Sequence, residues 1–261
     1  MGRRSRCLLL TTILLPLGCA MAQDNYEIQV YGSETVPRGA TMFELHSNFT
    51  FQGSKQAVDG VRPTNHQLHE TVEITHGLND WFEVGFYVFT AAQSATGWQW
   101  AGNHIRPRVR APEKWHWPVG VSLSTEFGYQ RPSYSADTWT WEIRPIVDKQ
   151  AGKLYVAFNP AFGRSLHGPG VRNGFDFSPN FKLGYGIAKK VSAGFEYYGS
   201  LGPVTGFDPF REQFQQFIPS VDLDFGPDWE FNFGVGVGVT RATDHLLVKM
   251  ILGRRFGGKR P

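Results

Sequence analysis

Charged side chains at alternating positions form the one constellation in this sequence that suggests chemistry. Arg106, Arg108 and Arg110 alternate along one predicted strand, so their guanidinium groups share one face of it. Charges on other predicted strands are expected on the same interior surface: Glu142, Arg144, Glu196, Asp222, Asp224 and Glu230. Facing rows of opposite charge in a pore form a constriction that orients polar solutes. The same residues could instead be a structural ion-pair network that fills a narrow lumen, and the sequence does not separate the two.

The first 22 residues carry the pattern of a secretory signal peptide, so we expect the mature chain to begin at Gln23. A basic start, an apolar run and a small-residue cleavage site follow one another: Arg3 to Arg6, Cys7 to Leu17, and Ala20 to Ala22. The apolar run is shorter than the roughly 20 residues that a spanning helix needs. Cys19 raises the alternative of a lipid-anchored protein, but the residues before it lack the leucine typical of that signal.

Removing this segment changes both the charge and the cysteine count. The full sequence has 26 Lys and Arg against 23 Asp and Glu, and residues 1–22 hold three Arg and no acid, which leaves 23 of each. A neutral mature chain has no basic footprint, so no nucleic-acid partner is expected. Both cysteines, Cys7 and Cys19, leave with the signal, which excludes disulfides and cysteine metal sites. We predict no cofactor and no metal.

The remaining sequence has a period of two rather than a helical period. In the run 229–240, large apolar side chains alternate with small or polar ones: Trp229, Phe231, Phe233, Val235, Val237 and Val239 against Glu230, Asn232, Gly234, Gly236, Gly238 and Thr240. Comparable alternation recurs from Thr41 onward and predicts an all-β chain of about twelve strands, with fourteen as an alternative. The alternating glycines of this run lack the turn-to-helix setting of a phosphate loop, and they leave room for something opposite them.

Three regularities favour a barrel in a membrane over a soluble one. Connections alternate between short turns and long loops, which is typical of a bacterial outer-membrane barrel. The predicted strands of about 10 to 12 residues match the length needed to cross a bilayer at a tilt. All eight tryptophans lie near predicted turns, as in an aromatic girdle, and strand charges mostly occupy the face opposite the aromatics. The sequence therefore predicts a transmembrane antiparallel up-and-down β-barrel in the bacterial outer membrane.

The expected organisation has four parts. Residues 1–22 are the signal peptide, 23–40 a segment that lies in the periplasm or threads the lumen as a partial plug, 41–256 the barrel, and 257–261 a tail. We expect the strand ending at Phe256 to pair with the strand starting at Thr41. Five prolines interrupt predicted strands and are expected to point outward: Pro107, Pro145, Pro160, Pro179 and Pro219. They could mark local bulges or a seam that opens toward lipid.

The segment Ile74 to Gly85, which contains Gly77-Leu78-Asn79-Asp80, resembles the first hairpin of an outer-membrane family named for meta-pathway phenol degradation and transport. Residues 233–240 and 247–256 are similar to the last strands of that family. The final row ending in Phe256 is similar to the signal read by the barrel-assembly machinery. The resemblance implies passive transport of small molecules and supplies no catalytic residues.

An outer-membrane lipid hydrolase is the enzymatic alternative, because such barrels use a serine and a histidine near the rim. The candidates are His46-Ser47, His104 and Ser165-Leu166-His167. Neighbouring residues on a strand point to opposite faces, so His46 and Ser47 cannot act together. After His104 the sequence continues Ile-Arg-Pro and lacks the serine that such a motif requires. We therefore expect no enzyme.

The function predicted from these observations is an outer-membrane channel or passive uptake protein for small organic molecules, with a lumen lined by charged residues. The alternative is a non-conducting structural or ligand-binding barrel whose lumen is plugged. The expected partners are outer-membrane lipid, the barrel-assembly machinery during insertion, and a small-molecule solute.

Overall fold

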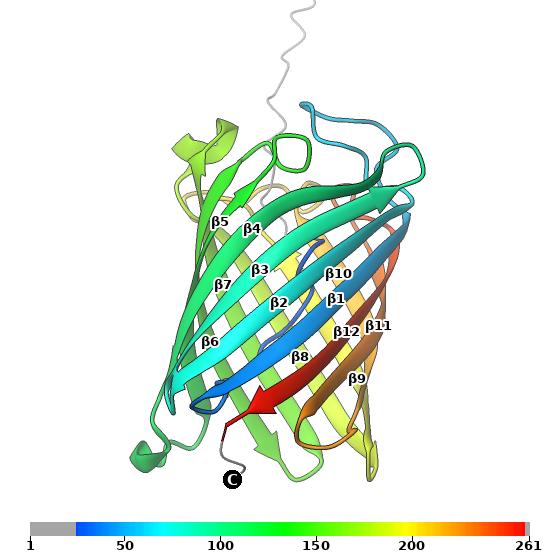
Figure 1. The fold of residues 1–261 in the computed structure, drawn as a ribbon. Helices are drawn as coiled ribbons and strands as arrows, with labels where there is room; N and C mark the ends of the chain where they lie inside the picture. The colour runs from blue at the N-terminus through cyan, green and yellow to red at the C-terminus, as the bar shows by residue number, and fades with distance from the viewer. Residues whose placement is uncertain (1–24, 259–261) are drawn as a thin grey trace, which may run out of the picture.

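The structure, a computed structural model, describes residues 25–258 and consists of one closed antiparallel barrel (Figure 1). The expected signal peptide and the end of the tail lie outside the described residues. Each strand pairs with its neighbours in sequence, and β1 pairs with β12 to close the ring. The prediction of an up-and-down barrel of twelve strands is therefore confirmed, and the alternative of fourteen is not needed.

The strands are 10 to 14 residues long, long enough to cross a bilayer when tilted. In order they are β1 (Ala40–Gln52), β2 (Gln67–Asn79), β3 (Phe82–Gln93), β4 (Gly97–Arg110), β5 (Gly120–Gln130), β6 (Trp139–Ala151), β7 (Leu154–His167), β8 (Asp176–Ala188), β9 (Val191–Ser200), β10 (Phe214–Leu223), β11 (Trp229–Gly238) and β12 (Leu246–Gly257). Two short 3₁₀ helices, η1 (Glu113–Trp115) and η2 (Pro169–Asn173), lie in connections. No helix among the described residues is long and apolar enough to cross a membrane.

The closing seam lies between the first and last strands, as the sequence predicts. Thr41 pairs with Phe256, and the register continues along both strands to Thr50 and Leu247. The rings of Phe43 and Phe256 meet edge to face with their centroids 5.7 Å apart. Because a closed ladder leaves no edge, the backbone amides and carbonyls of the wall find partners without water.

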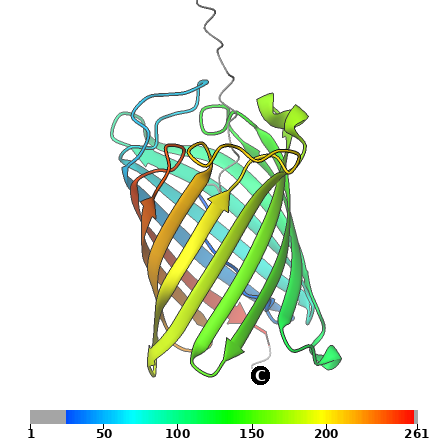
Figure 2. The ribbon, with the colours of Figure 1, turned by 180° about the vertical axis from the view of Figure 1, so that it is seen from behind.

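The two ends of the barrel carry different connections (Figure 2). Long connections such as 53–66 and 201–213 gather at one end, which we call the long-loop end. Turns such as 80–81, 152–153 and 189–190 gather at the other, the short-turn end. Two connections depart from this sorting: 94–96 is a tight turn at the long-loop end, and 111–119 with η1 is a longer excursion at the short-turn end.

The wall is apolar outside and polar inside, the reverse of a soluble barrel. Along β1, Phe43 and Leu45 are exposed, whereas the alternating Glu44, His46 and Asn48 are buried. The same inversion holds in β2, where Val72 and Ile74 face outward and Thr71, Glu73 and Thr75 face inward. Exposed apolar side chains around the whole wall are stable only against lipid, so the outward face places this barrel in a membrane.

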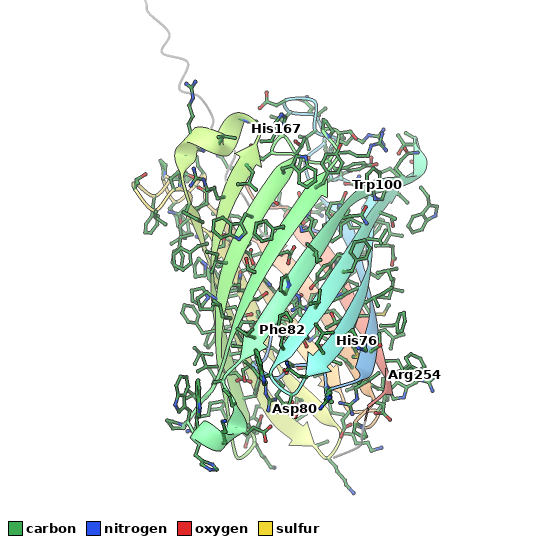
Figure 3. All side chains as sticks on the ribbon, turned by 60° about the vertical axis from the view of Figure 1, so that its left-hand side comes forward. His76, Asp80, Phe82, Trp100, His167 and Arg254 are labelled. Atoms are coloured by element: carbon green, nitrogen blue, oxygen red, sulfur yellow. The ribbon has the colours of Figure 1, made fainter. Side chains whose placement is uncertain are left out.

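Aromatic side chains mark both ends of the wall (Figure 3). Trp98, Trp100 and Trp139 are about half exposed near the long-loop end, and Trp81 and Trp229 near the short-turn end. Indole rings prefer the interface between lipid tails and water, because one edge is apolar and the N–H needs a partner. The tryptophans at the two ends therefore mark the two lipid–water interfaces, and the strands between them span the lipid tails.

The five strand prolines all alternate with buried inward residues, so they occupy outward positions. The pairing between β6 and β7 is continuous to Ile143–Phe162 and resumes at Val147–Phe158, and Pro145 and Pro160 fall in this gap. Similar gaps occur beside Pro107 between β4 and β5 and beside Pro219 between β10 and β11. Pro160 also lies directly opposite Pro179. Each gap arises because proline lacks the backbone N–H that a ladder needs. Pairing resumes within a few residues on either side.

A charged side chain on the outward face tests the membrane position of the wall. Val72 is exposed near the middle of β2, and Leu78 is exposed on the same strand near its end. We expect Val72→Arg to lower the free energy of unfolding in lipid vesicles by about 2–4 kcal/mol, and Leu78→Arg by about 0–1 kcal/mol, because the cost depends on depth. Guanidinium titration in vesicles measures both, and equal losses would contradict this orientation.

Candidate functional site

Residues 25–36, which we call the plug segment, run through the lumen from one end to the other (Figure 1). At the long-loop end the Asn25 side chain donates to Asp244 at 3.0 Å, and at the short-turn end the Val36 amide donates to Glu83 at 2.6 Å. All six residues from Tyr26 to Tyr31 are buried. The lumen of the barrel is therefore occupied by the chain's own backbone.

Polar side chains of the wall hold the backbone of the plug segment. Asn159 on β7 makes two bonds to Tyr31, accepting from its amide at 2.7 Å and donating to its carbonyl at 3.0 Å. Other inward side chains donate to its carbonyls: Lys249 to Ile28 (2.9 Å), Thr71 to Tyr26 (2.7 Å), Asn48 to Asn25 (2.8 Å), and Arg108 to Gly32 (3.2 Å) and Glu34 (2.6 Å). These side chains give several buried backbone groups of the plug segment partners that a strand ladder would otherwise supply.

The apolar residues of the plug segment pack on one side of the lumen. Ile28 and Val30 contact a buried cluster on strands β7, β9, β10 and β12: Ala157, Tyr198, Phe214, Ile218 and Leu247. A Cβ at Gly234 would lie 2.4 Å from Ile218, and one at Gly236 would lie 2.9 Å from Leu247. The alternating glycines of β11 thus leave space for these two side chains, which in turn contact the plug.

Tyr31 lies in the lumen among three arginines of strands β4 and β6. Its ring centroid is 4.5 Å from the guanidinium carbon of Arg106, 5.2 Å from that of Arg144 and 5.5 Å from that of Arg108. Its hydroxyl donates to Glu27 of the same segment. Cations placed over a phenol ring are attracted by its negative face, and this attraction grows when water is excluded.

Each of these arginines also has a carboxylate partner on the wall. Arg106 contacts Glu73 at 2.5 Å and Glu83 at 3.6 Å, and Arg108 contacts Glu83 at 2.7 Å. Arg144 contacts Glu142 at 2.6 Å and reaches Glu27 of the plug at 3.5 Å. Buried charges persist only when paired, so this arrangement makes the arginine-rich half of the lumen close to neutral.

A second network neutralises the other half of the lumen. Glu196 on β9 pairs with Lys249 and, at 3.4 Å, with Lys182. Lys182 also contacts Asp222 at 2.7 Å, and Asn232 donates to both carboxylates. This network reaches the plug through the bond from Lys249 to the carbonyl of Ile28.

The charged residues predicted from the sequence thus fall into four sets. Arg106, Arg108, Glu142 and Arg144 gather around Tyr31, whereas Glu196 and Asp222 belong to the lysine network. Glu230 accepts a bond from Gln29 of the plug segment at 3.1 Å. Arg110 and Asp224 lie near the short-turn rim, where Arg110 pairs with Glu113 and Asp224 accepts from the Gly226 amide. In the first two sets, and at Arg110, opposite charges pair with each other, whereas Glu230 and Asp224 accept bonds from neutral donors.

Several residues of the site were not singled out from the sequence. Tyr31 and Glu27 belong to the short run Tyr26 to Tyr31, whose alternation of apolar and polar residues was visible but weak. Asn159 is a lone amide between Phe158 and Pro160, and its role depends on a segment more than a hundred residues away. The lysines of the second network are inward-facing by the same alternation that revealed the arginines.

The histidines suggested for hydrolysis have other partners. The His46 Nε2 atom lies 3.3 Å from Glu73, His104 Nδ1 is bonded to Glu126, and His167 Nδ1 lies 2.8 Å from the Thr138 hydroxyl. Ser165 donates to Asp137 at 2.8 Å. None of these three histidines is hydrogen-bonded to a serine within the described residues, so the geometry does not assemble a nucleophile and base.

Glu44, His46 and Glu73 bring three potential metal ligands within 4.8 Å of one another. Glu73 is already engaged, because Arg106 donates to one of its oxygens at 2.5 Å and Thr75 to the same oxygen at 2.6 Å. A guanidinium bound to the same carboxylate repels a metal ion and occupies lone pairs of the carboxylate oxygen. The donor set therefore fits an ion-pair network better than a metal centre.

The plug segment separates two cavities. The long-loop vestibule, of about 420 Å³, is bounded by Asn25 and Glu27 of the plug together with His104, Glu126 and Tyr134 of the wall and loops. The short-turn vestibule, of about 710 Å³, is bounded by the plug at Gly32 to Glu34 and by Arg110, His116, Asp148 and Tyr155. Between them lie the buried Ile28, Val30 and Tyr31.

Comparison with known proteins supports the fold. No protein-family model matches the chain, and no curated protein matches its sequence. Among solved structures, the KdgM porin is similar with 11% identity and a TM-score of 0.51, covering 84% of this chain and 99% of that one. The NanC porin is similar with 7% identity and a TM-score of 0.52, covering 82% and 99%. The chain has the fold of a bacterial outer-membrane β-barrel, in agreement with its apolar outer face.

The anchoring of Tyr31 gives a direct test of the plug contacts. Asn159→Leu keeps the side-chain size but removes both bonds to the Tyr31 backbone. We expect hydrogen exchange of the Tyr31 amide to accelerate at least about fivefold, because one such bond is worth about 1 kcal/mol.

Asn180→Leu is the matched control, because Asn180 pairs with Asn159 in register and donates to Ser178 at 3.4 Å instead of to the plug. Exchange mass spectrometry on the peptide spanning residues 26–36 measures both variants. Equal protection in the two variants would show that Asn159 does not anchor the segment.

Proposed function

We propose that the protein is an outer-membrane uptake channel for small organic molecules and that the plug segment gates it. The observation that carries the proposal is a complete barrel whose polar lumen is closed by a separate stretch of chain. In the state described here the channel is shut. Solute passage requires the plug segment to shift inside the lumen or to leave it.

The wall does not depend on the plug segment for its closure. All twelve strands pair around the ring, and the plug contributes side-chain and backbone contacts but no strand to the ladder. Its backbone is held by hydrogen bonds that water could replace one by one, each with a net value of about 1 kcal/mol. Displacing the plug therefore leaves an intact barrel, which is the condition for a gate.

The vestibules support an uptake path. Each opens to one end of the barrel and is stopped by the same short stretch around Ile28 to Tyr31. A solute entering either vestibule meets charged and aromatic side chains before it meets the plug. The fold is shared with porins, and the resemblance of residues 74–85 to the phenol-degradation and transport family agrees with the same role.

A non-conducting barrel with a permanently filled lumen is the second candidate. The observation that favours it is the internal pairing of the lumen charges, which stabilises the plugged state and leaves few unpaired ions to attract a solute. Such a barrel would serve as a scaffold or a binding protein. The two candidates differ in whether the plug segment can move.

A reversible disulfide distinguishes them. A Cβ built on Gly120 of β5 lies 3.1 Å from the Ser33 Cβ in the plug segment, and disulfides need about 3.5–4.5 Å. A shift of about half an ångström therefore permits a bond, provided that the Asp148 carboxylate, 2.2 Å from the same position, rotates away. The described residues contain no cysteine of their own, so the bond would be unique there.

We expect the oxidised Ser33→Cys/Gly120→Cys variant to be closed in planar bilayers and in liposome-swelling assays, and reductant to restore the wild-type permeability. The single variants Ser33→Cys and Gly120→Cys, treated in the same way, should not respond to redox state. Equal permeability of the oxidised and reduced double variant would exclude a gate at this position. If wild type and the reduced variant both pass no ions and no solutes, the non-conducting barrel is correct.

A further inference from the structure

We propose that the long-loop vestibule is a binding site for an organic ammonium ion with an apolar body. The proposal names the substrate class of the uptake path and rests on the proposed function for its biological use. It stands on three features of the vestibule: the charge of its lining, one oriented pair of polar side chains, and an aromatic surface beside that pair.

The lining has a surplus of negative charge. Five carboxylates border the vestibule, and the one arginine among its lining residues is Arg144: the acids are Glu27, Glu126, Asp137, Glu142 and Asp244. Arg144 is shared between Glu142 and Glu27. A cavity with low-dielectric walls and several acids attracts cations.

Two of the acids are held by neutral donors rather than by cations. Asp137 accepts from the Ser165 hydroxyl at 2.8 Å and the Gly170 amide at 2.9 Å. Asp244 accepts from Asn25 at 3.0 Å and from Thr64 at 2.6 Å. These bonds fix the two carboxylates in place without cancelling their charge. Arg62 is near, but it is directed to Tyr134, whose hydroxyl it contacts at 3.2 Å.

His104 and Glu126 form an oriented pair beside the cavity. The Nδ1 atom of His104 is bonded to one oxygen of Glu126. Gly128 makes room for this geometry, because a Cβ there would lie 1.6 Å from the imidazole ring. Phe89 meets the ring edge to face at 4.5 Å. The imidazole is therefore held from three sides.

This pair keeps two polar atoms without a protein partner. His104 is 9% exposed and Glu126 is 8% exposed, yet the His104 Nε2 atom and the Glu126 Oε2 atom have no hydrogen bond. Both residues line the cavity. When Nδ1 carries the proton, Nε2 is an acceptor, and a carboxylate oxygen is always one. The Glu126 Oε2 atom is thus an acceptor without a donor, which suits a ligand that offers an N–H.

An ammonium group fits these requirements better than a neutral alcohol or an anion. It supplies two or three N–H donors for the acceptors and a positive charge for the acidic lining. The ring of Tyr134, which also borders the cavity and is only partly buried, offers an aromatic surface for an apolar body and for the cation itself. A cavity of about 420 Å³ accommodates an amine with one aromatic ring.

The test compares three probes of one size and different charge: phenethylamine, phenethyl alcohol and phenylacetate. Each is titrated calorimetrically into the purified barrel in detergent, with empty micelles as the blank. We expect phenethylamine, a cation at neutral pH, to bind at least about tenfold more tightly than the alcohol, the ratio given by a charge-assisted hydrogen bond, and phenylacetate not to bind.

Glu126→Gln should weaken binding of phenethylamine about tenfold, because it removes the charge and keeps the shape. Asp148→Asn is the matched control, since Asp148 borders the short-turn vestibule, and it should leave the affinity unchanged. Circular dichroism verifies that both variants fold. Equal binding of the three probes, or binding that matches the micelle blank, would overturn the proposal, as would equal effects of the two substitutions.

This result is independent of gating, because equilibrium binding at the vestibule does not require the plug to move. Binding of phenethylamine by a barrel that never conducts would retain the ammonium site and reject the channel. Conduction without selective binding of the amine would reject the site and retain the channel.

Discussion

The contact between Tyr31 and the three arginines of the lumen is the interaction around which the plugged lumen is arranged. Guanidinium groups within a narrow barrel need partners, and water is displaced from around them by the plug segment. The wall supplies carboxylates at 2.5 to 2.7 Å to Arg106, Arg108 and Arg144, and the phenol ring of Tyr31 lies within 4.5 to 5.5 Å of their guanidinium carbons. The negative face of the aromatic ring attracts the guanidinium groups and offsets part of the hydration that they lose when water is excluded.

The same logic explains how an unpaired stretch of backbone can lie in the lumen. A buried amide or carbonyl without a partner costs about 1–3 kcal/mol, and the plug segment makes no ladder with the wall. Asn159, Lys249, Thr71 and Arg108 supply partners for the Tyr31 amide and for five carbonyls of the segment. Because these are side-chain bonds, they can break singly, whereas a strand added to the ladder would have to separate as a unit. The plug is thus ordered by contacts that permit local release.

Alternation and loop sorting were enough to predict the fold from the sequence, because both are imposed by lipid at every strand. Phe43, Val72 and Phe233 had to face outward, and that requirement fixes the inner face as well. The role of residues 25–36 could not be decided in the same way. A short alternating run such as Tyr26 to Tyr31 suits a periplasmic strand or a lumen segment equally, and its partners come from strands β2 to β12.

The pairing of the charges was also beyond the sequence, since alternation gives the face of a residue but not its neighbour across the barrel. Arg110 and Asp224 share the predicted face yet lie at the rim, where strand ends diverge from the pattern.

The wall charges would remain balanced if the plug segment moved. Arg106 would keep Glu73, Arg108 would keep Glu83, and Arg144 would keep Glu142. On the other side, Lys182 would keep Asp222, and Lys249 would keep Glu196. Of the ion pairs described around Tyr31, the contact between Arg144 and Glu27 is the one that depends on the plug. Opening therefore requires hydration of pairs that already exist rather than the separation of bare ions, which is the expensive step in a low dielectric. In the proposed channel, a midsection of paired charges would offer a solute little net field, and discrimination between solutes would fall to the long-loop vestibule, where five carboxylates and one arginine line the cavity.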